Sequence, residues 1–575
     1  MAFKFTTDDR EYSSWNTFDS KTHLPVKIDG LNPLKERLLN QDIFDIFPSY
    51  KTGNVVIVHS TFRASKGIPS VLILEGDKSY GLLNKRKLYK CIPDDARLPV
   101  FLVPYEIKQM GFQKKILNKY VNIIFDNWEG KHPIAKIHNS IGDIDKLENF
   151  YEYQLYCKSL YSSIQGFTRA TCKALKRQSQ EEFIANIKTR RDLEDRTDWN
   201  IYTIDPKKCS DYDDAFSIKT DAETGETLLS IYISNVTFWM DELDLWDSFS
   251  ERISTIYLPD KKRPMLPTIL SECLCSLVEK ETRFGFTLDL TIKNDEIISK
   301  KFKNTVIRVK RNLVYDTQEM EETKEYQEVF QTLTTLNNKK EFKYIDNITT
   351  SHDVIAYLMI IMNYYSATEM EKNEIGLFRS ATVGKPPSVA ETLPSDIKKF
   401  LTIWQSSGGR YMKFSQEKPI GHHGYLRLDS YVHITSPIRR LVDLLNIIEM
   451  QNKLGLMDFT DKSKAFHDYW TSDEMLDYIN KTTRVIRRVQ CSCDLLHICS
   501  TNPETLQKKY SGYIFNKVVR SDKLYQYVVY IHELHMITKF ISRFEFDEYE
   551  EKSFRLFLFH DEDKFKKKIR LHLLD

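Results

Sequence analysis

The chain has no long apolar run, and this absence excludes a membrane-spanning helix, which needs about 18 or more such residues. The stretch LMIIM at residues 358–362 is far too short to cross a bilayer. The N-terminus, MAFKFTTDDR, lacks the apolar core of a secretory signal peptide. Low-complexity segments and internal repeats are also missing. We therefore expect a globular, cytoplasmic protein without a membrane partner.

An excess of one charge is missing as well. The 83 Lys and Arg residues nearly balance the 81 Asp and Glu residues, and the formal net charge is +2. Any nucleic-acid partner must therefore be bound by a local basic surface, because the chain as a whole has no strong positive field. A chain of 575 residues is too long for a single core, so we expect about two to four domains.

Cysteines at zinc-binding spacing are absent. The nine cysteines are scattered, and the pairs Cys273/Cys275 and Cys491/Cys493 have one intervening residue, whereas zinc sites use about two to four. We interpret them as buried, reduced thiols, with a zinc site as the less favoured alternative. Free thiols are typical of a reducing intracellular compartment.

The most informative feature of the sequence is an acidic stretch. Residues 204–216 read IDPKKCSDYDDAF and hold four carboxylates, Asp205, Asp211, Asp213 and Asp214. Crowded like charges raise one another's pKa, and either full solvation or a divalent cation relieves them. The flanking segments, residues 199–204 and 215–218, are apolar and argue against a solvated loop. The pattern therefore favours a metal site over a solvated acidic turn.

The nature of these ligands indicates the metal. Carboxylate oxygens suit Mg²⁺, with Mn²⁺ as an alternative. A calcium-binding EF-hand is excluded, because the loop lacks the required Gly and the later Glu.

The spacing D-x5-D-x-D-D resembles the catalytic motif of the RNase II/RNase R family of hydrolytic 3′→5′ exoribonucleases, which includes the catalytic subunit of the exosome. The resemblance implies a multidomain protein in which an α+β RNB catalytic domain is flanked by all-β OB-fold barrels. We expect a divergent cold-shock-like OB domain at 1–92, a second one at 93–165, a helical linker at 166–195, the RNB domain at 196–500 and an S1-like OB domain at 505–575. No segment ahead of the first barrel is long enough for the additional endonuclease domain of the exosome-type members.

The two ends of the chain support this division. Short strand-like runs at 54–59, 70–75, 100–104 and 121–125 are typical of small barrels, although a generic β domain is the alternative. Near the C-terminus, aromatic residues and the basic run KFKKKIR at 564–570 fit single-strand binding by stacking and phosphate contact.

A second motif is YVHITSPIRR at 431–440, followed by Asp443, which resembles the family's HxTSPIRRYxD block. We expect Pro437 at the first position of a helix, with Thr435 or Ser436 as its cap. A helix N-terminus attracts anions, and Arg439 would present its planar fork to a phosphate. For Arg440 we expect a salt bridge with Asp443.

Further residues match family positions. One series of family motifs is matched by three segments in order: TIYLP at 255–259, PMLP at 264–267 and CSL at 275–277. Two further family motifs are matched by LVYD at 313–316 and LFR at 377–379. The resemblance implies that Tyr257 stacks on RNA and that Tyr315 lies near the scissile phosphate. The RNA-contacting set that it implies is Tyr257, Tyr315, Arg283, His433 and Arg379.

Two positions depart from the family pattern. Asn235 stands where an Asp is common, and we expect it outside the metal's coordination shell. Ala356 and Tyr357 stand where the family has an acidic pair that contacts the terminal nucleotide. That acidic contact is therefore missing, with Tyr357 as a candidate replacement.

Taken together, the resemblance implies hydrolysis of single-stranded RNA from its 3′ end with release of nucleoside 5′-monophosphates. Asp205, Asp211 and Asp214 would hold divalent metal, Asp213 would assist a second metal and the attacking water, and Arg439 would stabilise the transition state. The alternatives are a catalytically weak or inactive RNA-binding protein on the same fold and a metal-binding domain without RNA. Membership of a larger RNA-decay assembly is not readable from the sequence.

Overall fold

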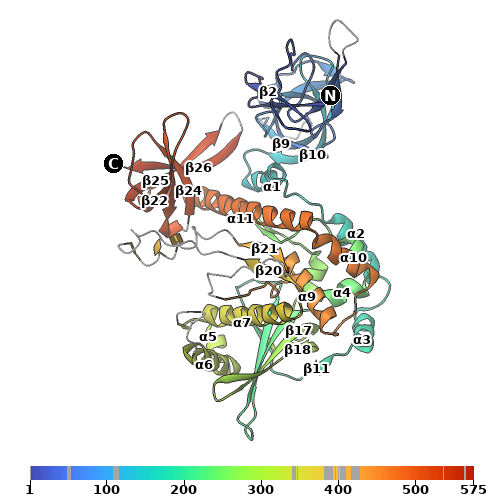
Figure 1. Ribbon diagram of the computed structural model, residues 1–575, viewed down its shortest axis with the longest axis vertical. Coiled ribbons are helices and arrows are strands. Elements are labelled where there is room, and N and C mark those ends of the chain that lie inside the picture. Colours follow the sequence, from blue (N-terminus) through green and yellow to red (C-terminus); the bar gives the residue numbers. More distant parts are fainter. Residues whose placement is uncertain are drawn as a thin grey trace. The chain divides into compact units, whose positions relative to one another are not determined.

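The computed structural model describes residues 2–47, 54–107, 116–339, 345, 347–380, 393–394, 397–398, 400–401, 409–415, 428–534, 536–561 and 565–574. The chain forms two compact units (Figure 1). The first contains residues 1–161, 258–260 and 488–575, and the second contains residues 162–257 and 261–487. Of the described helices, none is both long and apolar enough to cross a membrane.

The N-terminal part of the first unit contains two sheets. The first has the strand order β2-β1-β3-β4, with bounds Ala2–Thr7 (β1), Trp15–Asp19 (β2), Ile43–Phe47 (β3) and Asn54–His59 (β4). The second has the order β5-β9-β10-β8-β7-β6, and an additional β5–β7 pairing closes it into a barrel. Its strands are Ile68–Leu72 (β5), Leu82–Leu83 (β6), Arg86–Pro93 (β7), Phe101–Tyr105 (β8), Lys119–Asn127 (β9) and Ile134–Asp143 (β10). Helix α1 (Leu147–Cys157) follows.

The change from the first sheet to the second lies between β4 and β5, not at residue 92. The predicted boundary falls inside β7, whose Lys87–Cys91 stretch pairs with β8 and whose Ile92 pairs with Val71 of β5. The strand-like runs at 54–59 and 70–75 therefore belong to different sheets. Sequence patterning alone could not separate them, because both are short apolar strands.

A third sheet, near the C-terminus, has the order β24-β23-β22-β25-β26. Its strands are Tyr510–Val519 (β22), Tyr525–Ile531 (β23), Met536–Ser542 (β24), Glu551–Asp561 (β25) and Lys566–Leu574 (β26), and the short helix α12 (Glu504–Gln507) precedes it. Five strands in this order are typical of an OB-fold. Within the basic run, Arg570 lies over the ring of Phe559 at 3.8 Å, whereas Lys564 lies outside the described residues.

The second unit is built on a seven-stranded mixed sheet with the order β11-β18-β17-β14-β13-β12-β19. Its strands are Glu194–Arg196 (β11), Tyr202–Asp205 (β12), Asp214–Thr220 (β13), Thr227–Ser234 (β14), Thr282–Lys293 (β17), Glu296–Arg308 (β18) and Arg311–Val314 (β19). Two two-stranded sheets accompany it, formed by β15 (Ile256–Tyr257) with β16 (Lys262–Arg263) and by β20 (Leu377–Ser380) with β21 (Arg410–Lys413).

Helices cover one face of this sheet. Phe286, Leu288, Leu290 and Ile292 alternate along β17 and join one apolar core with α6 (Lys324–Lys339), α7 (Ser351–Lys372) and α9 (Leu441–Lys453). Figure 1 shows α7 running along this face. The other helices of the unit are Gln165–Leu175 (α2), Gln180–Arg190 (α3), Val236–Glu242 (α4), Gln318–Glu321 (α5) and Asp461–Trp470 (α10), and α11 (Asp473–Thr501) continues from this unit into the first.

The opposite face of the sheet holds a buried polar cluster. Arg196, on β11, donates to both carboxylate oxygens of Asp289 on β17, at 2.8 and 2.6 Å. Ser230 also donates to Asp289, at 2.7 Å. Because β-strand side chains alternate between faces, Asp289 points away from the apolar core that its neighbours Leu288 and Leu290 fill.

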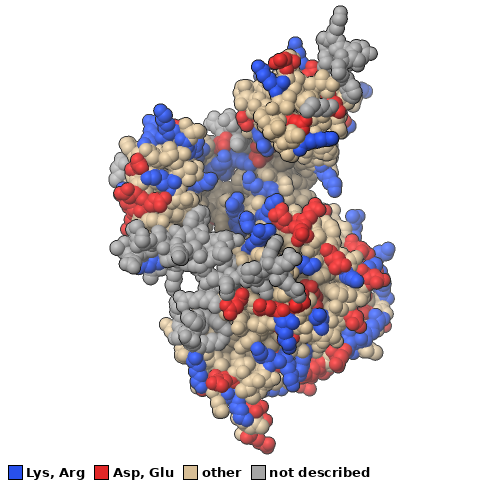
Figure 2. All heavy atoms as spheres, viewed as in Figure 1, with Lys and Arg blue, Asp and Glu red and all other residues tan. Residues whose placement is uncertain are grey.

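The surface charge agrees with the sequence, whereas the expected burial of the cysteines holds only in part. Figure 2 shows acidic and basic side chains interspersed on the visible face, in keeping with the small net charge. All nine cysteines are free. They are not all buried, however, because Cys172, Cys273 and Cys491 are exposed.

Candidate active site

Two neighbouring strand ends bring Asp205 and Asp214 together. Asp205 is the last residue of β12 and Asp214 is the first residue of β13, and these strands pair in the sheet. The loop between them carries Asp211 and Asp213. The apolar residues on either side, including Ile204 and Ala215, are buried. The acidic residues therefore lie at the edge of the core, as the flanking sequence predicted.

A turn at residues 275–277 fixes the acidic loop. Tyr212 donates its backbone N–H to Oγ of Ser276 at 2.9 Å, and that hydroxyl donates to the carbonyl of Ser210 at 3.0 Å. Leu277 donates its backbone N–H to the carbonyl of Tyr212 at 3.0 Å. Arg283 holds this turn from behind, donating Nε–H to the Ser276 carbonyl at 2.7 Å.

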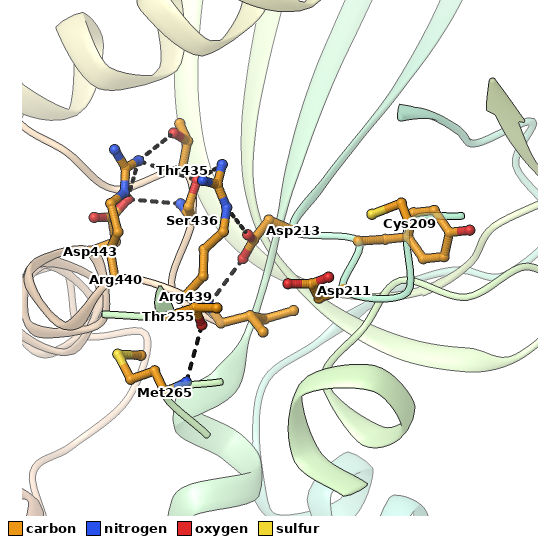
Figure 3. Close-up of polar contacts among 12 residues, drawn as sticks. Cys209, Asp211, Asp213, Thr255, Met265, Thr435, Ser436, Arg439, Arg440 and Asp443 are labelled. Carbon is orange, nitrogen blue, oxygen red and sulfur yellow. Dashed lines mark hydrogen bonds and ion pairs between the residues drawn. The ribbon is translucent and has the colours of Figure 1, made fainter. Parts of the chain in front are cut away.

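Asp213 is paired with protein donors at both carboxylate oxygens (Figure 3). Its Oδ1 accepts the backbone N–H of Ile438 at 3.0 Å, and its Oδ2 accepts Nε–H of Arg439 at 2.9 Å. The side chain is only 3% exposed. Burial raises the pKa of Asp213 to about 7, whereas these two donors favour the ionised form. Asp213 is thus the anchor of Arg439.

Arg439 keeps part of its guanidinium accessible. Its side chain is 41% exposed, although Nε binds Asp213 and Nη2 donates to Oγ of Ser436 at 2.8 Å. The backbone is fixed as well, because the Arg439 carbonyl accepts from the N–H of Thr255 at 3.0 Å. The result is a rigidly oriented cation beside the acidic loop.

The segment around Pro437 is a turn rather than the start of a helix, so that prediction is wrong. Helix α9 begins at Leu441, with Arg440 at its N-cap. Asp443 explains why the helix starts after Pro437. Its Oδ1 accepts hydrogen bonds from the backbone N–H of Ser436 and from Nη2 of Arg440, each at 2.8 Å. The predicted Arg440–Asp443 salt bridge is confirmed.

Asp211 points to a different partner. Its Oδ1 lies 2.8 Å from Nζ of Lys262, and its Oδ2 accepts the hydroxyl of Tyr257 at 3.4 Å. Lys262 also contacts Glu272 at 2.9 Å. Sequence reasoning missed Lys262, because nothing in its local sequence indicates a partner 51 residues away.

Asp205 and Asp214 are the two carboxylates without such partners. Oδ2 of Asp205 is buried and has no hydrogen-bond partner, Oδ1 lies 3.8 Å from the Cys209 thiol, and the neighbouring Thr203 side chain favours the ionised form. No hydrogen bond or ion pair to a described residue is recorded for Asp214. Burial raises the pKa of both groups, and the proximity of Asp205 raises that of Asp214 further. This is the electrostatic state that a bound cation would reverse.

Asp205 and Asp214 are therefore the carboxylates of this loop that are best placed to hold a divalent ion. Among the residues that the structure describes, no group of three or more His, Cys, Asp or Glu side chains is arranged to hold a metal ion. Mg²⁺ is commonly bound by one or two carboxylates, with water and substrate phosphate completing the octahedron. In this structure Asp211 and Asp213 pair with Lys262 and Arg439, and the involvement of all four aspartates in metal binding stays a prediction.

Two predicted aromatic residues lie at this site. Tyr257 is 41% exposed and contacts Asp211. Tyr315 donates its backbone N–H to the Asp205 carbonyl at 3.2 Å. Its ring stacks on His352, with the ring centroids 3.9 Å apart and the planes at 12°. His352 was not predicted, and its contact depends on the position of α7 against the sheet.

The three other predicted RNA contacts lie elsewhere. Arg283 is 4% exposed and donates to backbone carbonyls, so in this structure it supports the acidic loop, and its contact with RNA stays a prediction. His433 hydrogen bonds through Nδ1 to the Tyr411 hydroxyl at 2.7 Å, and Arg379 lies over the same ring at 4.7 Å. No interaction between either residue and the four aspartates is recorded in the described part of the chain, and their contacts with RNA stay predictions.

Of the residues that depart from the family pattern, Asn235 and Tyr357 are buried. Asn235 is 1% exposed and donates to Oδ1 of Asn304 at 3.1 Å, and its place outside the metal's coordination shell stays a prediction. Tyr357 is 0% exposed within the apolar core, so its proposed role as a replacement nucleotide contact is wrong. Ala356 is exposed and has no polar atom in its side chain.

Comparison with known proteins places this geometry in a family. The sequence model of the RNB domain matches residues 190–338. Ribonuclease R of Chlamydia muridarum is 25% identical over 351 residues, which cover 50% of each chain; the chain thus spans about half the length of the curated relatives that it matches first.

Two solved structures share the fold. Mycoplasma genitalium RNase R in complex with ribose-methylated single-stranded RNA has a TM-score of 0.66 at 16% identity, covering 100% of both chains. Yeast Ssd1, described as a pseudonuclease, has a TM-score of 0.55 at 13% identity, covering 94% of this chain and 78% of Ssd1. The fold is thus RNase R-like, with an α+β catalytic domain flanked by OB-type β-barrel sheets. From the RNB match and these relatives, the chain contains an RNB domain and is similar to proteins of the RNase II/RNase R family.

Proposed function

We propose that this chain is a divalent-metal-dependent exoribonuclease that hydrolyses single-stranded RNA from the 3′ end and releases nucleoside 5′-monophosphates. One observation carries the proposal: two half-buried carboxylates that form no ion pair with a described lysine or arginine, Asp205 and Asp214, lie beside Arg439, a cation that Asp213 holds in place. This is the arrangement expected where a phosphodiester must be bound and its developing charge stabilised.

Each side chain has a role that follows from its contacts. A divalent ion at Asp205 and Asp214 would supply an activated water and neutralise phosphate charge. Arg439, oriented by Asp213 and Ser436, donates to the phosphate oxygen on which negative charge grows. The half-exposed ring of Tyr257 offers a surface on which a base can stack.

The second candidate function is RNA binding without hydrolysis. It is favoured by one observation, the fold shared with a pseudonuclease, and by the missing acidic side chains at Ala356 and Tyr357. The retained aspartates and their partners favour the enzyme. RNA is the proposed partner in both cases, and the proposed cofactor is Mg²⁺ or Mn²⁺.

The polarity and sugar preference of the reaction test this proposal. With Mg²⁺ and a 5′-labelled single-stranded RNA, we expect a ladder of products shortened from the 3′ end and nucleoside 5′-monophosphates in solution. An all-deoxy strand of the same sequence should stay intact, because the 2′-hydroxyl distinguishes RNA from DNA. Release of the 5′ nucleotide first, or cleavage of a circular RNA, would contradict the proposal.

A further inference from the structure

Lys262 occupies an unusual place for a lysine, between two carboxylates at the edge of the acidic loop. Its Nζ lies 2.8 Å from Oδ1 of Asp211 and 2.9 Å from Oε1 of Glu272. It also donates to Oγ of Ser210 at 2.7 Å. The side chain is 24% exposed and that of Asp211 is 11% exposed, so this is a largely desolvated ion pair.

The backbone fixes this position from two sides. Lys262 pairs with Tyr257 across the β15–β16 hairpin, and the hydroxyl of Tyr257 donates to the other oxygen of Asp211. Ser210 belongs to the loop that the Ser276 hydroxyl holds. Lys262 and Asp211 are therefore held opposite each other by elements that do not depend on the ion pair itself.

The charges around the acidic loop divide into matched sets. Arg439 pairs with Asp213, and Lys262 lies between Asp211 and Glu272, so its single charge is shared by two carboxylates. Asp205 and Asp214 remain, and together they carry the charge that one divalent ion balances. A second divalent ion at Asp211 would stand next to the Lys262 ammonium, and like charges at that separation repel strongly.

We propose that Lys262 takes the place of a second divalent cation at Asp211, so that the site binds one divalent ion, at Asp205 and Asp214. The inference deepens the proposed function and rests on it. The Lys262 ammonium then supplies a single positive charge where a second divalent ion would otherwise bind. The site needs free metal at one position only.

The test counts bound Mn²⁺ on the metal-free full chain, using the electron paramagnetic resonance signal of the free ion. The signal of an Asp205→Asn/Asp211→Asn/Asp214→Asn variant, in which both candidate positions are disabled, is subtracted to remove adventitious surface binding. We expect one Mn²⁺ per chain for the wild type and two for Lys262→Met, which keeps the length of the side chain and removes its charge. The double variant Lys262→Met/Asp211→Asn should return to one.

Two matched variants keep the result interpretable. Lys262→Arg keeps the charge and Lys261→Met removes the exposed neighbouring charge, and both should bind one Mn²⁺. If Lys262→Met does not fold, Asp211→Asn decides: it should bind one Mn²⁺, as the wild type does. Two ions on the wild type, falling to one in Asp211→Asn, would overturn the inference and leave the proposed function standing. No Mn²⁺ on any variant would overturn both.

Discussion

Replacing Asp213 by Asn should slow RNA hydrolysis by about 100- to 1,000-fold, the usual cost of losing one preorganised transition-state donor. The variant keeps the shape of the side chain but removes the charge that holds Nε of Arg439 at 2.9 Å. RNA affinity should change much less, because it comes mainly from phosphate contacts and stacking along the strand. Single-turnover rates at saturating Mg²⁺, compared with filter-binding affinities, measure the two effects.

A double variant shows through which group Asp213 acts. If Asp213 works by orienting Arg439, the Asp213→Asn/Arg439→Ala protein should be no slower than the slower single variant, because residues that act as a unit have non-additive effects. If the two losses multiply instead, Asp213 has a separate role, such as the metal contact predicted from the sequence. Near-UV circular dichroism of all three variants checks that the fold is retained.

Replacing Arg196 by Met should destabilise the catalytic unit by roughly 3–5 kcal/mol, the usual cost of breaking a buried ion pair. The Arg196 side chain is 1% exposed, and its guanidinium binds both oxygens of Asp289 and lies 4.2 Å from the Trp199 ring. Methionine leaves Asp289 buried with only Ser230 and a more distant Lys303. Urea unfolding followed by tryptophan fluorescence measures the loss, since Trp199 packs against the substituted side chain.

The control for this prediction is Arg311→Met. Arg311 also pairs with a carboxylate, Glu319 at 2.7 Å, but the two side chains are 48% and 58% exposed. Exposed pairs contribute little, so the unfolding midpoint should stay close to that of the wild type. An Arg196→Met protein with an unchanged midpoint would mean that the cluster opposite the apolar core does not stabilise the sheet.

The acidic loop was predictable from sequence because its four aspartates are close along the chain, and Asp205 and Asp214 begin and end the same loop. What each carboxylate does was not predictable. The partners that decide it, Lys262 and Arg439, are 51 and 226 residues away from Asp211 and Asp213. Spacing indicates that charges are crowded, whereas only the fold shows which of them are already neutralised.

Two errors have different physical origins. At Pro437, local capping rules favoured a helix start, but Asp443 and Asp213 accept the backbone N–H groups of Ser436 and Ile438 in a turn. At Tyr357, the sequence did contain the signal: the residue lies three after Val354 and four before Ile361, on the apolar stripe of α7. At Tyr357 the interpretation followed the family motif, although the helical periodicity correctly indicated a buried position.

Hydrolysis and binding measured together, with wild type and Asp214→Asn side by side, test the central claim most directly. Both proteins are incubated with Mg²⁺ and a 5′-labelled single-stranded RNA, and shortening and complex formation are followed in the same samples. The wild type should shorten the RNA only when Mg²⁺ is present, and Asp214→Asn should bind the RNA and leave it intact. A wild-type protein that binds the RNA without shortening it, or an Asp214→Asn protein that shortens it at the wild-type rate, would contradict the account.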